Sequence, residues 1–161
     1  QNSIFEGFLV EKGEVQLMVG IMEDKKYNIK DAKMLPPLVL AYIGDSVFEL
    51  FIREKLVSSG IRNVHKLHVN AITYVRAKSQ SFMVHELADI LNPDEQEIVR
   101  RGRNANTHTH PKNADISDYR YATGFESLIG YLYLTNQTER MSHILERSFE
   151  LMNKEKGFNE H

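Results

Sequence analysis

The segment 38–51 is an apolar run that contains two carboxylates, Asp45 and Glu49. Its hydrophobic residues recur at the spacing of one helix face: Leu40, Ile43, Val47, Leu50 and Phe51. We therefore expect a mostly buried amphipathic helix. Gly44 lies inside it, where glycine costs about 1 kcal/mol relative to alanine, so another element is expected to approach the backbone closely. Because Asp45 borders this apolar face, its carboxylate needs a proton, a basic partner or a metal ion.

The composition limits what the chain can be. Its 161 residues are enough for one domain with a single core, or for one domain and a tail. The absence of cysteine excludes disulfides, thiolate zinc sites and cysteine nucleophiles. No apolar run reaches the ~18 residues that span a membrane and no secretory leader is evident, so we expect a soluble cytoplasmic protein with no membrane partner. The net charge of −2 implies that any RNA-binding surface is a local patch.

The remaining patterns predict further helices and no strand after residue 30. We expect helices at 38–58, 93–102, 119–134 and 139–153, and one long helix or two joined ones over 64–91. Residues 1–30 form an N-terminal extension of unassigned role, 31–153 form the domain, and 154–161 are a charged tail. The expected fold class is all-α.

A second acidic centre repeats the pattern of the first. Glu126 lies among the apolar residues of segment 125–132, with Gly130 one helical turn away. Carboxylates from two packed helices that converge on one point would form a hard-oxygen site suited to Mg²⁺ or Mn²⁺. Such a metal can activate water and stabilise the oxygens of a phosphodiester. The residue types alone leave a second interpretation open, in which these carboxylates form salt bridges with nearby arginines: Arg53, Arg76 or Arg120.

Two motifs resemble those of a known family. The segment 41–47, Ala-Tyr-Ile-Gly-Asp-Ser-Val, resembles the ribonuclease III signature that carries the catalytic Asp. The segment 125–130, Phe-Glu-Ser-Leu-Ile-Gly, resembles the later segment that carries the catalytic Glu. Several acids of that family are replaced here, by Leu38, Ala41, Phe82 and Thr123. With the segments 76–80 and 101–105, these departures are similar to the Mini-ribonuclease III branch, and the resemblance covers about residues 31–153.

The resemblance implies an all-α ribonuclease III endonuclease domain that homodimerises and cuts double-stranded RNA with Mg²⁺, for which Mn²⁺ can substitute. By this analogy Asp45 and Glu126 are catalytic and hold the metal. Glu49 lies one helical turn after Asp45 on the same face, so it is either an outer ligand or the partner of an arginine. The implied substrate is the precursor of 23S ribosomal RNA, cut to leave 5′-phosphate and 3′-hydroxyl ends without a nucleotide cofactor. An alternative is a ribosome-associated scaffold of this fold that binds RNA without cutting it. An unrelated helical metal phosphohydrolase would need a histidine-rich centre, which the sequence does not predict.

Basic and polar residues near two helix ends are candidates for RNA contact. Those expected to bind RNA are Arg76, Lys78, Arg101, Arg103, Asn104 and Lys112. A-form RNA is recognised mainly through its phosphates and 2′-hydroxyls, which suits such side chains. Cations at a helix C-terminus also complement the helix dipole, and Lys78 could instead neutralise the buried carboxylates, so a structural role stays open. The histidines do not show three or four ligands at the fixed spacing of a zinc site, and no HExxH motif is present, so we take them as surface or RNA-proximal residues.

Overall fold

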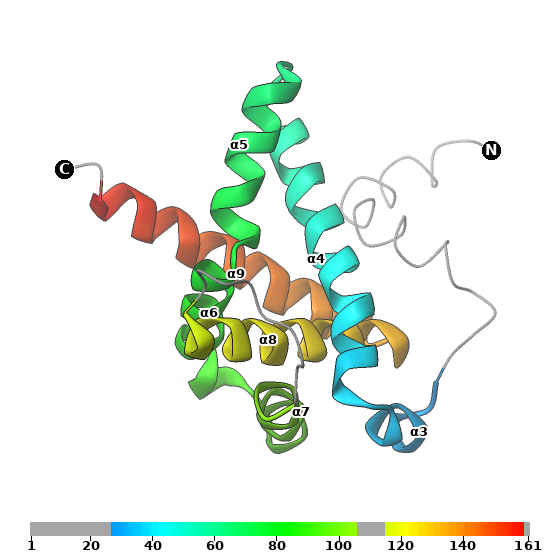
Figure 1. The fold of residues 1–161 in the computed structure, drawn as a ribbon. Coiled ribbons are helices and arrows are strands. Elements are labelled where there is room, and N and C mark those ends of the chain that lie inside the picture. The colour runs from blue at the N-terminus through cyan, green and yellow to red at the C-terminus, as the bar shows by residue number, and fades with distance from the viewer. Residues whose placement is uncertain (1–26, 106–114, 160–161) are drawn as a thin grey trace, which may run out of the picture.

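A computed structural model describes residues 27–105 and 115–159, with side chains described as far as residue 156 (Figure 1). Every regular element in these ranges is helical, which confirms the expected all-α class. The elements are α3 Ile29–Met34, α4 Pro37–Ser58, α5 Val64–Val75, α6 Ala77–Glu86, the 3-10 helix η1 Ala88–Ile90, α7 Pro93–Arg103, α8 Ile116–Leu134 and α9 Thr138–Asn159. None of the described helices is long and apolar enough to cross a membrane.

Helix α8 is the centre of the fold. It packs against α4, α6 and α7, and also contacts α3 and α9 (Figure 1). Its side chains are buried along most of its length, and the Phe125 ring meets the Phe48 ring of α4 edge to face, with centroids 5.0 Å apart. A helix buried on nearly all sides is apolar nearly all round. This explains why a carboxylate on α8 is out of place unless it has a function or a partner.

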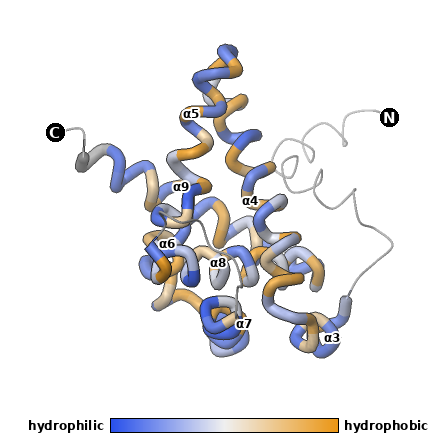
Figure 2. The backbone as a smooth tube through the Cα atoms, in the orientation of Figure 1, coloured by the Kyte–Doolittle hydropathy of each residue, from blue (hydrophilic) through white to orange (hydrophobic). Residues whose placement is uncertain are grey.

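Helices α4 and α5 extend away from the other helices as an antiparallel hairpin (Figure 1). Apolar positions continue along both helices to the tip of this hairpin (Figure 2). Several of them are exposed, and the Val64 side chain at the start of α5 is 78% exposed. The hairpin therefore presents apolar surface that the described part of the chain does not cover.

The expected helices agree with the structure apart from their ends. The stretch 64–91 forms two helices and a short 3-10 turn, because Arg76 adopts extended backbone angles between α5 and α6. Helix α8 begins at Ile116 rather than at Tyr119, since the Asp115 side chain caps it by accepting the N–H groups of residues 117 and 118. Helix α9 extends six residues past the expected end at 153.

Helix α3 was not predicted. It begins at Ile29, with the Asn28 side chain accepting the N–H of Asp31 at 2.8 Å, and its residue Ala32 is fully buried. The proposed boundary between extension and domain at residue 30 therefore falls inside a helix that packs on α8. Residues 1–26, where the role of the extension was left open, lie outside the described residues.

Candidate active site

Two glycines bring the backbones of α4 and α8 into direct contact. A Cβ added to Gly44 would lie 1.7 Å from the backbone oxygen of Glu126, and one added to Gly130 would lie 1.9 Å from the backbone oxygen of Leu40. No side chain fits in either place. Gly44 thus allows the close backbone approach that its position in the first apolar helix predicted. This crossing places Asp45, the neighbour of Gly44, beside Glu126.

The two carboxylates share one environment that disfavours their charge. Burial raises the pKa of Glu126 to about 7, with the negative charge of Asp45 contributing and a hydrogen bond from Gln80 opposing the shift. Asp45 lies at the surface, and its pKa is raised by partial desolvation and by the charge of Glu49. Neither carboxylate forms an ion pair with another described residue. The contact of Gly44 with the Glu126 backbone and the effect of the Asp45 charge on the pKa of Glu126 show that the structure brings the two predicted site residues together.

The salt-bridge interpretation applies to Glu49 and not to Asp45 or Glu126. The Arg53 guanidinium donates to the Glu49 carboxylate at 2.9 Å, one turn along α4. Arg76 instead donates from its Nε to the Ser79 hydroxyl at 3.1 Å, and Arg120 is exposed. Glu49 therefore has an arginine as partner, while its charge still adds to the negative field at Asp45.

Gln80 is a site residue to which the sequence assigned no role. Its side chain is 2% exposed, and its Nε2 donates to a Glu126 carboxylate oxygen at 3.0 Å and to the Val75 carbonyl at 2.9 Å. Among the described atoms its Oε1 has no hydrogen-bond partner. Gln80 lies between two buried serines on α6, so the hydrophobic pattern contained no signal of its burial.

The two carboxylates are hard oxygen ligands of the kind that Mg²⁺ takes in proteins. The described part of the chain contains no cluster of three or more histidine, cysteine or acidic residues that could enclose a metal. Thr123, where the family pattern has an acid, is buried and donates its hydroxyl to the Tyr119 carbonyl. Mg²⁺ accepts such a sparse site because it is commonly held by one or two carboxylates, with waters and substrate phosphates as the other ligands.

The predicted RNA-binding residues occupy different environments. Arg101 uses its guanidinium within the fold, donating to the carbonyls of Lys33 and Leu35 at the end of α3. Arg103 donates to the Tyr121 hydroxyl at 3.2 Å and to the side chain of Asn104, which is exposed. RNA contact by these residues stays a prediction.

The other candidates lie on or near α6 or outside the described residues. Arg76 and Lys78 are exposed at the start of α6, the helix that supplies Gln80. The contact between Gln80 and Glu126 places this helix beside the acidic centre. Lys112 lies outside the described residues, as do the histidines at 108 and 110.

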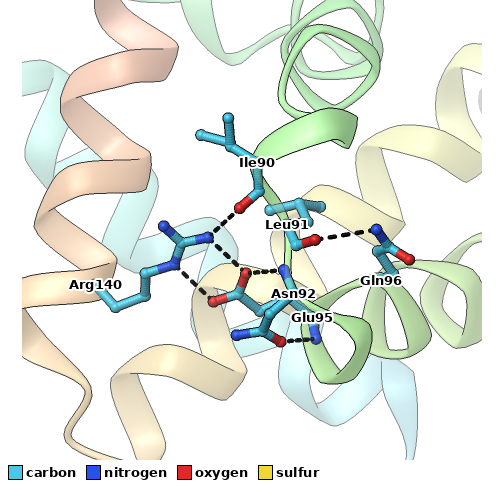
Figure 3. Close-up of polar contacts among 6 residues, drawn as sticks. All are labelled: Ile90, Leu91, Asn92, Glu95, Gln96 and Arg140. Atoms are coloured by element: carbon cyan, nitrogen blue, oxygen red, sulfur yellow. Dashed lines mark hydrogen bonds and ion pairs between the residues drawn. The ribbon is translucent and has the colours of Figure 1, made fainter.

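Glu95 is a buried carboxylate with a purely structural role (Figure 3), and it contrasts with Glu126. It is 1% exposed, and Arg140 donates to its two oxygens from Nε and Nη2, both at 2.8 Å. The backbone N–H of Asn92 also donates to it, at 2.9 Å, which completes a capping box at the start of α7. Burial alone would raise the pKa of Glu95, but the bonds from Arg140 and Asn92 hold it below the usual value. Glu126 has no such cation among the residues that the structure describes.

Comparison with known proteins places this site in a family. A model of the ribonuclease III domain matches residues 38–137, a range that contains both catalytic candidates. The chain belongs to the ribonuclease III family. The Mini-ribonuclease 3 of Thermoanaerobacter sp. is 45% identical over 136 residues, covering 84% of this chain and 96% of that protein. The Mini-ribonuclease 3 of Symbiobacterium thermophilum is 48% identical over 118 residues, covering 73% and 91%.

A solved structure agrees with the family assignment. The crystal structure of a protein from Fusobacterium nucleatum matches with a TM-score of 0.67 at 28% identity, covering 74% of this chain and 96% of that one. The resemblance to the Mini-ribonuclease III branch of the ribonuclease III family is thus confirmed. Membership of the ribonuclease III family supports an endoribonuclease.

The raised pKa of Glu126 predicts a pH-dependent stability in the metal-free protein. This pKa is about 7 in the folded chain, against an ordinary value of 4.5. Between these pH values the folded state holds a proton that the unfolded state has lost, so the free energy of unfolding falls as pH rises through that window. At ~1.36 kcal/mol per pH unit the fall is about 3 kcal/mol.

The Glu126→Gln variant should lack this component, because glutamine does not titrate. Urea unfolding in EDTA at about pH 5 and about pH 7.5 measures how the free energy of unfolding changes with pH. Over that interval the wild type should lose about 2 to 3 kcal/mol more of this free energy than the variant does. The other titrating groups are shared and their contributions cancel in the comparison, apart from that of Asp45, whose charge interacts with Glu126. Equal pH dependence in the two proteins would show that Glu126 ionises normally.

Proposed function

We propose that this chain is a metal-dependent endoribonuclease that cleaves double-stranded or structured RNA, with Asp45 and Glu126 as its catalytic pair. The observation that carries the proposal is a pair of carboxylates from two helices, held together without a cationic partner among the described residues. Such a pair costs stability, since each charge opposes the other in a partly dry place. Groups perturbed in this way are typical of functional sites.

In this proposal Asp45 and Glu126 hold Mg²⁺, or Mn²⁺ in its place. When bound, the cation would make water a better nucleophile and stabilise the phosphodiester oxygens. The 5′-phosphate and 3′-hydroxyl ends are those that the family resemblance implies. Gln80 restrains one Glu126 oxygen through its hydrogen bond and leaves the other without a described partner. Glu49, fixed by Arg53, contributes negative charge near Asp45 and is at most an outer ligand.

The substrate we infer is a long RNA stem, and the precursor of 23S ribosomal RNA in the cytoplasm is the specific candidate. Arg76 and Lys78 lie at the start of α6, close to the helix position that contacts Glu126, so they suit the phosphates beside the scissile bond. Arg103, Asn104 and Lys112 would extend the contact along the stem. Arg101 would act mainly by holding α3 in place.

A homodimer is part of the proposal. Helix α4 exposes apolar side chains, and its Tyr42 is 77% exposed. The other exposed apolar residues include Leu38, Val39 and Val57 on α4 and Val64 and Ile72 on α5. Exposed apolar surface of this kind commonly marks a protein interface, and a closed dimer is the simplest way to cover it. Two sites would then act on one stem.

Cleavage of a labelled, fully paired RNA stem in Mg²⁺ tests the proposal. The Asp45→Asn variant should bind the stem and cut it at least about 100-fold more slowly, a loss of about 2.7 kcal/mol in transition-state stabilisation. Asp89→Asn makes the same change at an exposed residue of η1 and should cut within about twofold of the wild type.

Other outcomes of this experiment are equally informative. If the wild type binds stems, including the ribosomal precursor, but cuts none of them in Mg²⁺ or Mn²⁺, the non-catalytic RNA-binding scaffold is the better description. If the Asp45→Asn variant cuts as fast as the wild type, the assignment of Asp45 is wrong.

A further inference from the structure

A hollow of about 300 Å³ lies between α6, α7 and α8, beside the candidate active site and not part of it. Its floor is apolar and includes Val84, Leu91 and Val99. Its polar lining consists of Gln96, Arg100, His85, Arg103 and Tyr121, and we call the last three the planar rim. An apolar floor with a few polar groups at the edge is the usual composition of a small-ligand site.

The three groups of the planar rim hold one another in place. The ring centroids of His85 and Tyr121 are 4.1 Å apart, and the two planes are tilted by 49°. The Arg103 guanidinium carbon lies 5.5 Å from the Tyr121 centroid, and this arginine also donates to the Tyr121 hydroxyl. His85 is exposed, and its Nδ1 bonds to the Ser81 carbonyl at 2.7 Å, so Nδ1 is the protonated nitrogen.

This combination of side chains suits a nucleobase. Unstacked RNA bases bind on aromatic rings and on the guanidinium plane of arginine, with hydrogen bonds to their edges. With Nδ1 protonated, the Nε2 of a neutral His85 is an acceptor for such an edge. Arg103 adds a positive charge for the phosphate of the same nucleotide.

The helices place the planar rim at a short, defined distance from the catalytic pair. Gln80 on α6 contacts Glu126 on α8, whereas His85 on α6 contacts Tyr121 on α8. His85 lies five residues after Gln80 on α6, and Tyr121 lies five residues before Glu126 on α8. The two helices therefore run antiparallel. Five residues correspond to about 7.5 Å along a helix. That is about two nucleotide steps of a nucleic-acid strand at ~3.4 Å each.

We infer that this hollow binds one unpaired nucleobase of the RNA, about two nucleotides from the scissile phosphate. The inference rests on the proposed function and adds a determinant of substrate choice to it. A base within a continuous stem is stacked on both faces and offers only its edges, so it cannot lie on the planar rim. A bulged base has left the stack and can do so. The protein should then favour a stem that is interrupted near its cleavage site.

The inference is tested with two kinds of RNA stem. One is fully paired, and the other is a series of stems in which a single unpaired adenosine stands at successive positions around the cut. With Ca²⁺ in place of Mg²⁺ to limit cleavage, we expect the wild type to bind the interrupted stem about tenfold more tightly at the best position, the low end of what stacking contributes. His85→Ala and Tyr121→Leu should bring the ratio of the two dissociation constants to about one. Tyr121→Phe keeps the ring and should keep most of the preference.

The outcomes separate this inference from the proposed function. His85 is exposed, so its variant is expected to fold even if the substitution of the half-buried Tyr121 disturbs the core. If the wild type cuts the paired stem but shows no preference at any bulge position, or if both variants retain the preference, the hollow is not a base site and the endonuclease proposal stands. If the wild type neither binds nor cuts either stem, both proposals fail.

Discussion

The Gly44→Ala variant should lose about 4 kcal/mol or more of its free energy of unfolding, and much of the protein should fail to fold at 37 °C. The added methyl group would lie 1.7 Å from the backbone oxygen of Glu126 and 2.8 Å from the backbone nitrogen of Gly130. Both obstacles are backbone atoms of a buried helix, so no side-chain rotation relieves the overlap. The gain in helix propensity from alanine, about 1 kcal/mol, is too small to compensate.

Thermal and urea unfolding followed by circular dichroism measure this effect. Gly60→Ala is the matched control, because it makes the same change at a glycine that has no other atom within 4 Å of the added carbon. Gly60 has a φ of 91°, so alanine there should cost only the backbone strain of about 1 to 2 kcal/mol. If both variants lose the same small amount, α4 and α8 can move apart at little cost, and the crossing does not define the active site.

The position of the catalytic pair follows from sequence to a large extent, because its determinants are local. Gly44 and Gly130 interrupt apolar helical runs, and a glycine in such a place indicates close backbone contact. The sequence could not show that the two glycines meet at one crossing, since that depends on the relative register of α4 and α8. The structure supplies this register and with it the neighbourhood of Asp45 and Glu126.

The environments of Gln80 and Arg101 depend on tertiary contacts that the sequence does not reveal. Gln80 is buried within a polar stretch of α6, and hydrophobic periodicity gives such a residue no signal. Arg101 lies in a basic cluster that favours RNA contact, yet its guanidinium bonds to the carbonyls at the end of α3. Because α3 has only six residues and one buried side chain, no hydrophobic pattern predicts a partner for Arg101 there.

The Arg140→Ala variant should lose about 3 to 5 kcal/mol of its free energy of unfolding at neutral pH. Arg140 is the cation beside Glu95, whose carboxylate is 1% exposed and receives two of its hydrogen bonds from this arginine (Figure 3). The same arginine donates to the Ile90 carbonyl at 2.6 Å, which ties the η1 segment to α9. Removing it leaves a buried negative charge with only the Asn92 N–H as a described partner.

The control is Arg147→Ala on the same helix. Arg147 pairs with Glu150 at 3.2 Å on the surface, an arrangement that contributes about 0.5 kcal/mol or less. Urea unfolding of the two variants at one pH separates a buried pair from an exposed one. A loss below about 1 kcal/mol for Arg140→Ala would mean that water reaches Glu95 once the arginine is gone.

The pH dependence identifies the cause of the loss. The pair holds the folded-state pKa of Glu95 below its ordinary value of 4.5, so its stabilisation is present above pH 4.5 and is lost as pH falls through the folded-state pKa. The difference between wild type and Arg140→Ala should therefore narrow in acid, where Glu95 is neutral in both. A Glu95→Gln, Arg140→Met double variant removes both charges and should recover much of the stability at neutral pH. Glu126 differs from Glu95, because no described cation neutralises its charge. A substitution at Glu126 therefore removes an unpaired charge. Glu95 is thus a carboxylate that stabilises this fold through its ion pair with Arg140. Glu126 is a carboxylate whose ionised form lowers the free energy of unfolding.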